Sequence, residues 1–106
     1  MAVAQRMYAR ALFEAAREAG RLDTVHRELT LVASALEETP ELAAFLSNPQ
    51  LEPAAKADVL EQVAEGADVL VRNFLRLLAE KGRAGELAQI AADFDALVDE
   101  AVSASS

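Results

Sequence analysis

The chain has 106 residues, a formal net charge of −8 and no cysteine. This length suits one domain that buries about two thirds of its unfolded surface in a single core. The lack of cysteine excludes thiolate metal sites, a cysteine nucleophile and disulfides, and it fits a reducing compartment. The negative charge and the scattered basic residues argue against nucleic-acid binding, because affinity for a phosphate backbone comes mainly from clustered Lys and Arg.

The N-terminal region does not read as a targeting segment. Arg6, Arg10 and Arg17 interrupt it, so it lacks the apolar run of a signal peptide, and no later stretch approaches membrane-spanning length. We therefore expect a soluble, intracellular chain without direct membrane insertion.

Composition favours helix almost throughout, because Ala, Leu and Glu dominate and β-branched runs are missing. We predict an all-α six-helix bundle. The first helix is predicted from Val3 to Ala19, with Gly20 at the C′ position, and the second from Leu22 to Glu38. Thr39-Pro40-Glu41 combines an N-cap residue, a proline at the first helical position and an acid favourable to the helix dipole, so it begins a short third helix that ends before Asn48.

Proline and glycine also delimit the second half of the chain. Pro53 opens a fourth predicted helix that stops at Gly66, the fifth covers Ala67 to Lys81, and the sixth runs from Gly85 to Val102. Residues 1–102 are predicted to form one domain, and residues 103–106 are expected to fray.

The second and sixth predicted helices each carry one apolar stripe. On a helical wheel their apolar residues fall within about 100° and 120°, the width that one buried face requires. The predicted core positions are Leu22, Val25, Leu29, Val32, Ala33 and Leu36 in the second helix, and Leu87, Ile90, Ala91, Phe94, Leu97, Val98 and Ala101 in the sixth.

The first and fifth predicted helices are apolar over a wider arc, about 200° in the first, which is too wide for one seam. In both helices the apolar arc has two halves, which we call wings. One wing can be buried in the core, and the other is spare, because the core does not need it. The core wings are Ala9, Leu12, Phe13 and Ala16 in the first helix, and Val71, Phe74, Leu75 and Leu78 in the fifth. The spare wings are Ala4, Tyr8, Ala11 and Ala15 in the first helix, and Leu70 and Leu77, bordered by Asn73, in the fifth.

If the two spare wings adjoin, they form an apolar groove suited to an amphipathic partner helix. Other readings stay open: another helix of the same chain covers the wings, the alanines are simply exposed, or the wings of two copies meet in a homodimer.

Residues with catalytic or metal-binding chemistry are sparse. His26 is the sole histidine, so it cannot by itself supply a di-iron or zinc site. A phosphotransfer role for His26 is an alternative function, although no basic-glycine motif follows it in HRELT. Glu37, Glu38 and Glu41 are expected to form a solvated helix junction, and Leu31 falls outside its helix's stripe. We expect neither an enzyme nor a cofactor nor a bound metal.

Three segments, in this order and spacing, carry a family resemblance. YARALFEAAREAG near the start, LSNP at 46–49 with Lys56 following, and NFLRLLAEKGR at 73–83 resemble the N-terminal domain of the ATP synthase delta subunit. The mitochondrial counterpart of that subunit is the oligomycin-sensitivity-conferring protein. The resemblance covers nearly the whole chain.

The resemblance implies a six-helix, non-catalytic stator module on the head of an F-type ATP synthase, with the N-terminal helix of an alpha subunit bound between the first and fifth helices. By family analogy Tyr8, Ala11, Asn73 and Leu77 match groove positions. Ala4, Ala15, Leu70 and Phe74 are added from the helical wheel.

The resemblance also implies a cytoplasmic location, peripheral to the inner face of the cell membrane. Family members are longer and engage b-type stalk subunits through a C-terminal region. The sequence is therefore expected to be an isolated domain, to which stalk binding is not assigned.

Overall fold

The computed structural model describes residues 3–105, and the side chains of residues 5–102. Within that range the chain forms six α-helices and no strand, which confirms the all-α six-helix prediction. The elements are α1 (Val3–Glu18), α2 (Leu22–Glu38), α3 (Pro40–Ser47), α4 (Pro53–Val63), α5 (Val69–Glu80), a short 3₁₀ helix η1 (Ala84–Glu86) and α6 (Leu87–Ser105).

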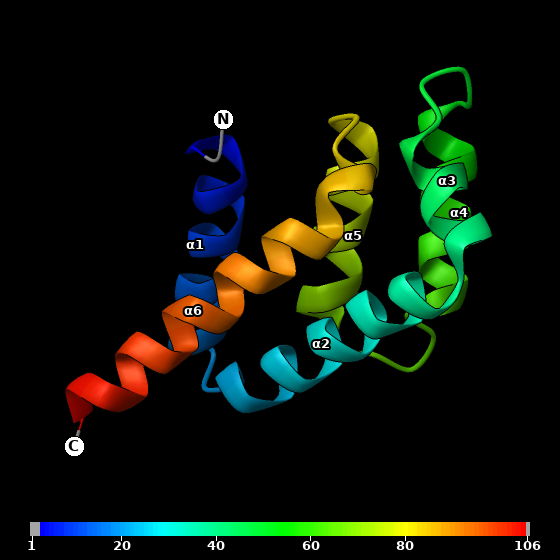
Figure 1. Ribbon diagram of the computed structural model, residues 1–106. Coiled ribbons are helices and arrows are strands. Elements are labelled where there is room, and N and C mark those ends of the chain that lie inside the picture. The colour runs from blue at the N-terminus through cyan, green and yellow to red at the C-terminus, as the bar shows by residue number, and fades with distance from the viewer. Residues whose placement is uncertain (1–2, 106) are drawn as a thin grey trace.

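Helix α5 occupies the middle of the bundle. It contacts α1 on one side and packs extensively against α4 on the other. Helix α6 descends from the upper end of α5 and crosses α1, and α2 runs along the base (Figure 1). Helix α3 packs against α2 and η1. The molecule therefore has one end built from α1 and α6 and another built from α3 and α4.

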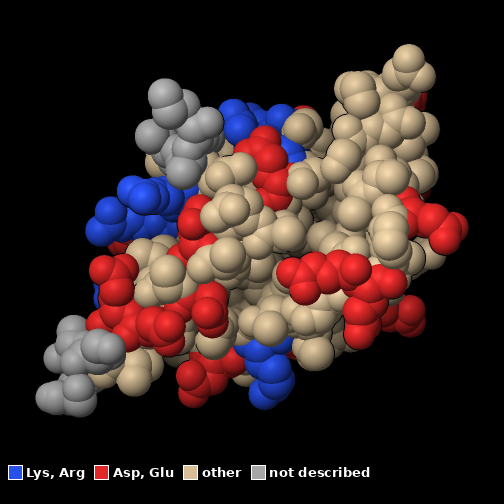
Figure 2. Space-filling model, viewed as in Figure 1, with Lys and Arg blue, Asp and Glu red and all other residues tan. Residues whose placement is uncertain are grey.

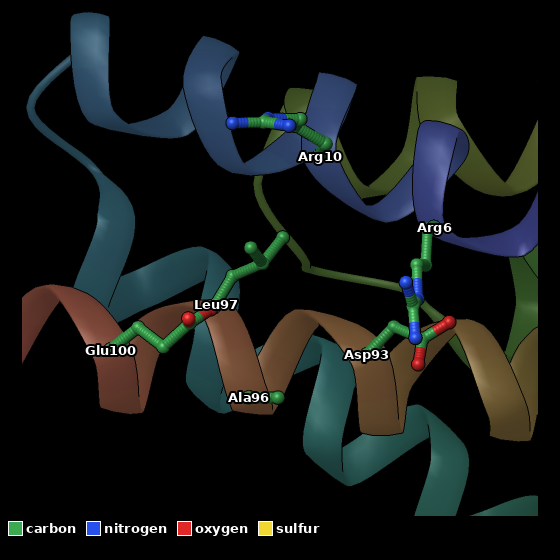
Figure 3. A pocket seen from close by; sticks show the side chains of 6 residues that line it. All are labelled: Arg6, Arg10, Asp93, Ala96, Leu97 and Glu100. Carbon is green, nitrogen blue, oxygen red and sulfur yellow. The ribbon is translucent and has the colours of Figure 1, made fainter. Parts of the chain in front are cut away.

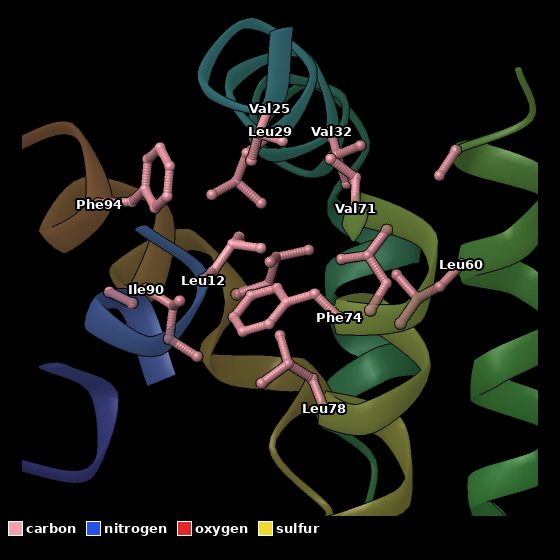
Figure 4. Close-up of a cluster of buried hydrophobic side chains, with 14 of the residues drawn as sticks. Leu12, Val25, Leu29, Val32, Leu60, Val71, Phe74, Leu78, Ile90 and Phe94 are labelled. Atoms are coloured by element: carbon pink, nitrogen blue, oxygen red, sulfur yellow. The ribbon is translucent and has the colours of Figure 1, made fainter. Parts of the chain in front are cut away.

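The core lies where these helices face one another. Leu12, Leu29, Phe74, Ile90 and Phe94, from four different helices, point into one cluster (Figure 4). The single stripes predicted for the second and sixth helices are confirmed. The buried members are Val25, Leu29, Val32 and Leu36 in α2 and Leu87, Ile90, Phe94 and Val98 in α6, and the half-buried ones are Leu22, Ala33, Ala91, Leu97 and Ala101.

Two of the predicted helix boundaries around residue 66 are wrong. Helix α4 ends at Val63 instead of Gly66, because the chain turns through residues 64–66, with a positive φ of 83° at Gly66. Helix α5 begins at Val69 instead of Ala67, because Asp68 is its N-cap and accepts a hydrogen bond from the Leu70 amide at 2.9 Å. Asp68 therefore precedes α5, although the predicted fifth helix included it.

The other boundaries differ in smaller ways. Helix α6 begins at Leu87, after η1, and extends to Ser105, beyond the predicted end at Val102. Thr39 holds the N-cap position of α3, as predicted, but its side chain makes no capping hydrogen bond. Fraying of the tail stays a prediction, and Ser106 lies outside the described residues.

Helices α1 and α5 end in the same motif. Gly20 and Gly82 each have a φ of +71°, the left-handed conformation that glycine adopts readily. The amide of the following arginine then donates back to the helix: Arg21 to the Ala16 carbonyl at 2.9 Å, and Arg83 to the Leu78 carbonyl at 2.7 Å. The motif therefore fixes the position of an arginine just past each helix.

Charge is unevenly spread over the molecular surface. Acidic side chains gather over α6 and over the junction of α2 and α3 (Figure 2). Glu37, Glu38 and Glu41 are all exposed at that junction. Among the described residues, no helix combines the length and the apolar character needed to cross a bilayer.

Candidate functional site

Helix α1 has a buried face, and one edge of that face lies next to α6. The buried wing is Ala9, Leu12, Phe13 and Ala16, as predicted. Arg6 and Arg10, at one margin of that wing, line a cavity of about 490 Å³ shared with α6 (Figure 3). Tyr8, Ala11 and Ala15 lie on the opposite margin by helical periodicity. The spare wing of α1 therefore faces away from that cavity.

Helix α5 turns one margin toward α4. Its buried wing includes Val71, Phe74, Leu75 and Leu78, which confirms the core prediction for this helix. Arg76, at one margin, forms an ion pair with Glu61 of α4. Leu70 and Leu77 lie on the opposite margin by helical periodicity. Helix α1 also contacts α5, so we infer that this margin lies toward α1.

Two arginine contacts tie α1 and α5 together, one at each end. Arg21, just past α1, donates to Asp68 Oδ2 at the start of α5 at 2.8 Å. Arg83, just past α5, holds its guanidinium carbon 5.6 Å from the ring centroid of Tyr8 in α1, a cation–π contact. The end of each helix thus meets the beginning of the other, so α1 and α5 run antiparallel.

This register sets the levels of the spare side chains. At about 1.5 Å of rise per residue, Leu77 lies level with the turn of α1 between Ala11 and Ala15. Leu70 lies further along, near the Arg21 end. We call the surface formed by Tyr8, Ala11, Ala15, Leu70, Asn73 and Leu77 the α1/α5 strip.

Exposure differs among the predicted groove residues. Ala11, Asn73 and Leu77 are exposed, with 37% of the Leu77 surface accessible. Tyr8, Ala15 and Leu70 are half-buried. Phe74 is buried and belongs to the core, so it offers a partner little surface. The side chain of Ala4 lies outside the described residues. Binding of a partner by this set stays a prediction.

The roles of Arg21 and Arg83 did not emerge from the sequence alone. Both follow a glycine that ends a helix, and the repeated Gly-Arg pair at 20–21 and 82–83 is the available signal. Glu86 holds the Arg83 guanidinium at 3.3 Å, which steadies it beside Tyr8. These two arginines bracket the strip.

Asp68 links α5 to two other helices besides capping it. Its amide donates to Glu28 Oε1 of α2 at 2.8 Å, and its carboxylate accepts from Arg21. The hydrogen bond from the Leu70 amide lowers the pKa of the Asp68 carboxyl below its ordinary value of 3.8, the Arg21 guanidinium adds to this, and partial burial opposes it.

We expect Asp68→Asn to lower stability at neutral pH and to lose that effect in acid. Because the folded-state pKa of Asp68 is depressed, its contribution is present above pH 3.8 and disappears as the pH falls through the lowered value. Urea unfolding of both proteins between pH 6 and pH 2.5 should show the gap in unfolding free energy closing below about pH 4. A gap that is constant with pH would contradict the proposed charge contribution. Asp58→Asn, on an exposed acid of α4, controls for the loss of one negative charge.

The cavity between α1 and α6 has a mixed-charge lining. Arg6 points toward Asp93 across it, and Glu100 lies at its other end (Figure 3). Gln89 donates to Asp93 Oδ1 at 3.4 Å, and Asp93 Oδ2 is buried without a partner among the described residues. An apolar helix would leave these charges without solvent, so this cavity is a poor match for one.

His26 is held by α6. Its Nε2 lies 2.6 Å from Asp95 Oδ1, and its ring centroid is 6.0 Å from that of Phe94. A phosphoacceptor nitrogen must be free to attack, so this contact disfavours phosphotransfer through Nε2. Among the described residues no group of three or more His, Cys, Asp or Glu is arranged to hold a metal ion. Leu31 is exposed and borders the turn after α4 instead of α3.

Comparison with known proteins identifies the family. The family model described as the ATP synthase delta (OSCP) subunit matches residues 4–105. The ATP synthase subunit delta of Carboxydothermus hydrogenoformans is 42% identical over 94 residues, covering 89% of this chain and 52% of the relative. That of Symbiobacterium thermophilum is 44% identical over 102 residues, covering 95% and 54%. The chain spans about half the length of these curated relatives. By both comparisons, the chain belongs to the ATP synthase delta (OSCP) subunit family.

Proposed function

We propose that this chain is a non-catalytic stator module of an F-type ATP synthase. Its α1/α5 strip binds the N-terminal helix of an alpha subunit and so links the catalytic head to the peripheral stalk. What supports this most is that α1 and α5, the two helices with a spare apolar margin, run antiparallel and in contact, with an arginine contact at each end. The relatives' name, ATP synthase subunit delta, supports the assembly in which the module works.

The strip suits the apolar face of a helix in shape as well as in polarity. Ala11 and Ala15 have small side chains that let a partner backbone approach closely, and Leu77 stands level with them. Tyr8 offers an aromatic face with a polar tip, the kind of side chain that anchors interfaces. A helix seated here buries roughly 1,200 Å² in total, the lower end of the range for specific complexes.

The mechanical role requires tight binding without chemistry. A stator joint holds the head still against rotor torque, so it needs slow dissociation and a rigid seat. The Arg21 and Arg83 contacts join α1 to α5 at both ends of the strip, and the buried wings of the two helices hold them in the core. Within the complex, the module would lie peripheral to the inner face of the cell membrane, in the cytoplasm. Contact with b-type stalk subunits is not assigned to these residues.

A synthetic peptide with the sequence of the alpha subunit's N-terminal helix, from the same organism, tests this function. We expect one peptide to bind per chain with a dissociation constant of about 1 μM or lower. Calorimetry gives the affinity, and light scattering gives the mass of the chain alone and with peptide. A scrambled peptide of equal composition is the control. A free chain that is already dimeric and rejects the peptide would favour the homodimer reading instead.

A further inference from the structure

Lys56, on α4, is the one charged side chain buried within the described part of the protein, with 7% of its surface exposed. Lysine is almost never buried to this degree unless it is paired. The side-chain hydrogen bonds and ion pairs of the described residues all join other groups. The Lys56 ammonium therefore has no counter-charge among the described residues.

The ammonium nevertheless keeps some contact with solvent. Asp93 Oδ2 is the one side-chain oxygen or nitrogen that the described residues bury completely without a partner. Lys56 Nζ also lacks a partner, so it cannot be completely buried. The lysine stem is thus enclosed while its charged end stays accessible, as is common for long cationic side chains.

A cavity of about 500 Å³ provides that access. Lys56 lines it together with residues from the end of α3, the α3–α4 connection, the end of α5 and η1. Most of its wall is apolar and includes Leu46, Leu51, Pro53 and Ala79. The end of the molecule that carries the α3–α4 connection shows few charged atoms in Figure 2.

The acid that also lines this cavity is already paired. Glu86 accepts from Arg83 at 3.3 Å and 3.4 Å, and Arg83 in turn faces Tyr8. Glu86 is thus engaged away from Lys56, and no ion pair joins the two. The positive charge of Lys56 thus has no ion-pair partner among the described residues.

One wall of the cavity is closely packed. A Cβ atom added to Gly85 would lie 2.7 Å from Ser47 Oγ and 3.0 Å from Ser47 Cα. These distances are shorter than van der Waals contact, so η1 packs against the end of α3 as closely as glycine permits. The cavity is therefore formed before any ligand arrives, which limits the entropy lost on binding.

We propose that this cavity is a second docking site, which receives an acidic side chain flanked by an apolar one from a partner protein. The carboxylate pairs with Lys56, and the apolar neighbour packs against the accessible side chains of Pro49, Leu51 and Pro53. The volume lies within the range of about 300–1,000 Å³ that holds small ligands or a few side chains. Helices α3 and α4 lie on the side of α5 away from α1 (Figure 1), so this site does not depend on the function proposed for the strip.

The lining favours a carboxylate over a phosphate group. One ammonium and the Ser47 hydroxyl offer few donors, whereas a phosphate dianion usually takes several donors or a guanidinium fork. Apolar walls also fail to replace the strong hydration of a dianion. A single carboxylate next to an aliphatic group matches both the charge and the walls.

Titration with 4-methylpentanoate, followed by NMR of backbone amides and lysine ammonium groups, tests the proposal. We expect saturable shifts at Ser47, Lys56 and Gly85, with a dissociation constant of about 1–10 mM for so small a fragment. The neutral analogue 4-methylpentanamide should bind at least about tenfold more weakly, because it lacks the negative charge that would pair with the Lys56 ammonium.

The chain offers a matched control, because it has two lysines and the other, Lys81, is exposed. Lys56→Met should abolish saturation while Lys81→Met leaves it unchanged, and Lys56→Arg, which keeps the charge, should retain binding if the methionine variant fails to fold. Equal binding of acid and amide would overturn the proposal, as would equal effects of the two methionine variants. Tighter binding of inorganic phosphate than of 4-methylpentanoate would also overturn it, in favour of a phosphate site.

Discussion

Replacing Phe94 by alanine lowers the free energy of unfolding by about 3 to 5 kcal/mol. The ring is completely buried and lies at the point where α6 meets α1 and α2. It packs edge-on against Phe13, with centroids 6.0 Å apart and planes at 70°, and it lies beside the His26 ring. Truncation removes these contacts and leaves a cavity between α1, α2 and α6. The three helices cannot all move inward to fill it. Urea unfolding, monitored by helical circular dichroism, measures the loss.

A loss of this size is large for a domain whose total stability is about 5 to 15 kcal/mol. Val102→Ala is the matched control, because Val102 lies on the same helix with 65% of its surface exposed. Its effect should stay within about 0.5 kcal/mol. If Phe94→Ala cost no more than this control, α6 would not be packed as described, and the position of α1 against α6 would have to be revised.

Composition, helical periodicity and the positions of proline and glycine predicted the six helices, because most of the chain follows these local rules. The stripe of α2 and that of α6 are buried where the wheel places them, and the core wings of α1 and α5 are as well. Gly20 adopts the left-handed conformation expected at its predicted C′ position, and Gly82 ends α5 in the same way. These features depend on local sequence and on the polarity of single side chains, so they can be read without knowing which helix lies next to which.

Features that depend on contacts between distant residues could not be read in this way. Asp68 fell inside the predicted fifth helix, and its capping role is visible only with the turn that precedes α5. The contact of Arg83 with Tyr8 joins residues that are far apart in sequence. Lys56 sits on a helix of weak periodicity, so its burial follows from α3, α5 and η1 closing over it. Sequence patterns predict which face of each helix is apolar and which is polar. Which other helix contacts each face depends on tertiary packing.

Replacing Ala11 by aspartate weakens binding of the alpha-subunit peptide at least about 100-fold, because an unpaired carboxylate would be buried under an apolar helix. Ala11 is exposed in the free chain, and Leu77 stands level with its turn of α1. The new carboxylate remains hydrated until the peptide binds. Stability should therefore fall by less than about 1 kcal/mol, which is mostly the lower helix propensity of aspartate. Calorimetry with the peptide and urea unfolding together measure the two effects.

The pair of measurements separates a docking surface from a core surface. Ala92→Asp adds the same charge at an exposed alanine of α6, so it shares the helix-propensity cost but should leave peptide affinity unchanged. If Ala11→Asp unfolds the chain, Ala11 belongs to the core and the spare wing of α1 does not exist. If Ala11→Asp folds and binds as tightly as the parent, the peptide docks elsewhere, and the accessible surfaces of Tyr8 and Leu77 have no docking role. Only loss of affinity with retained stability fits a strip whose apolar surface exceeds what its own fold buries.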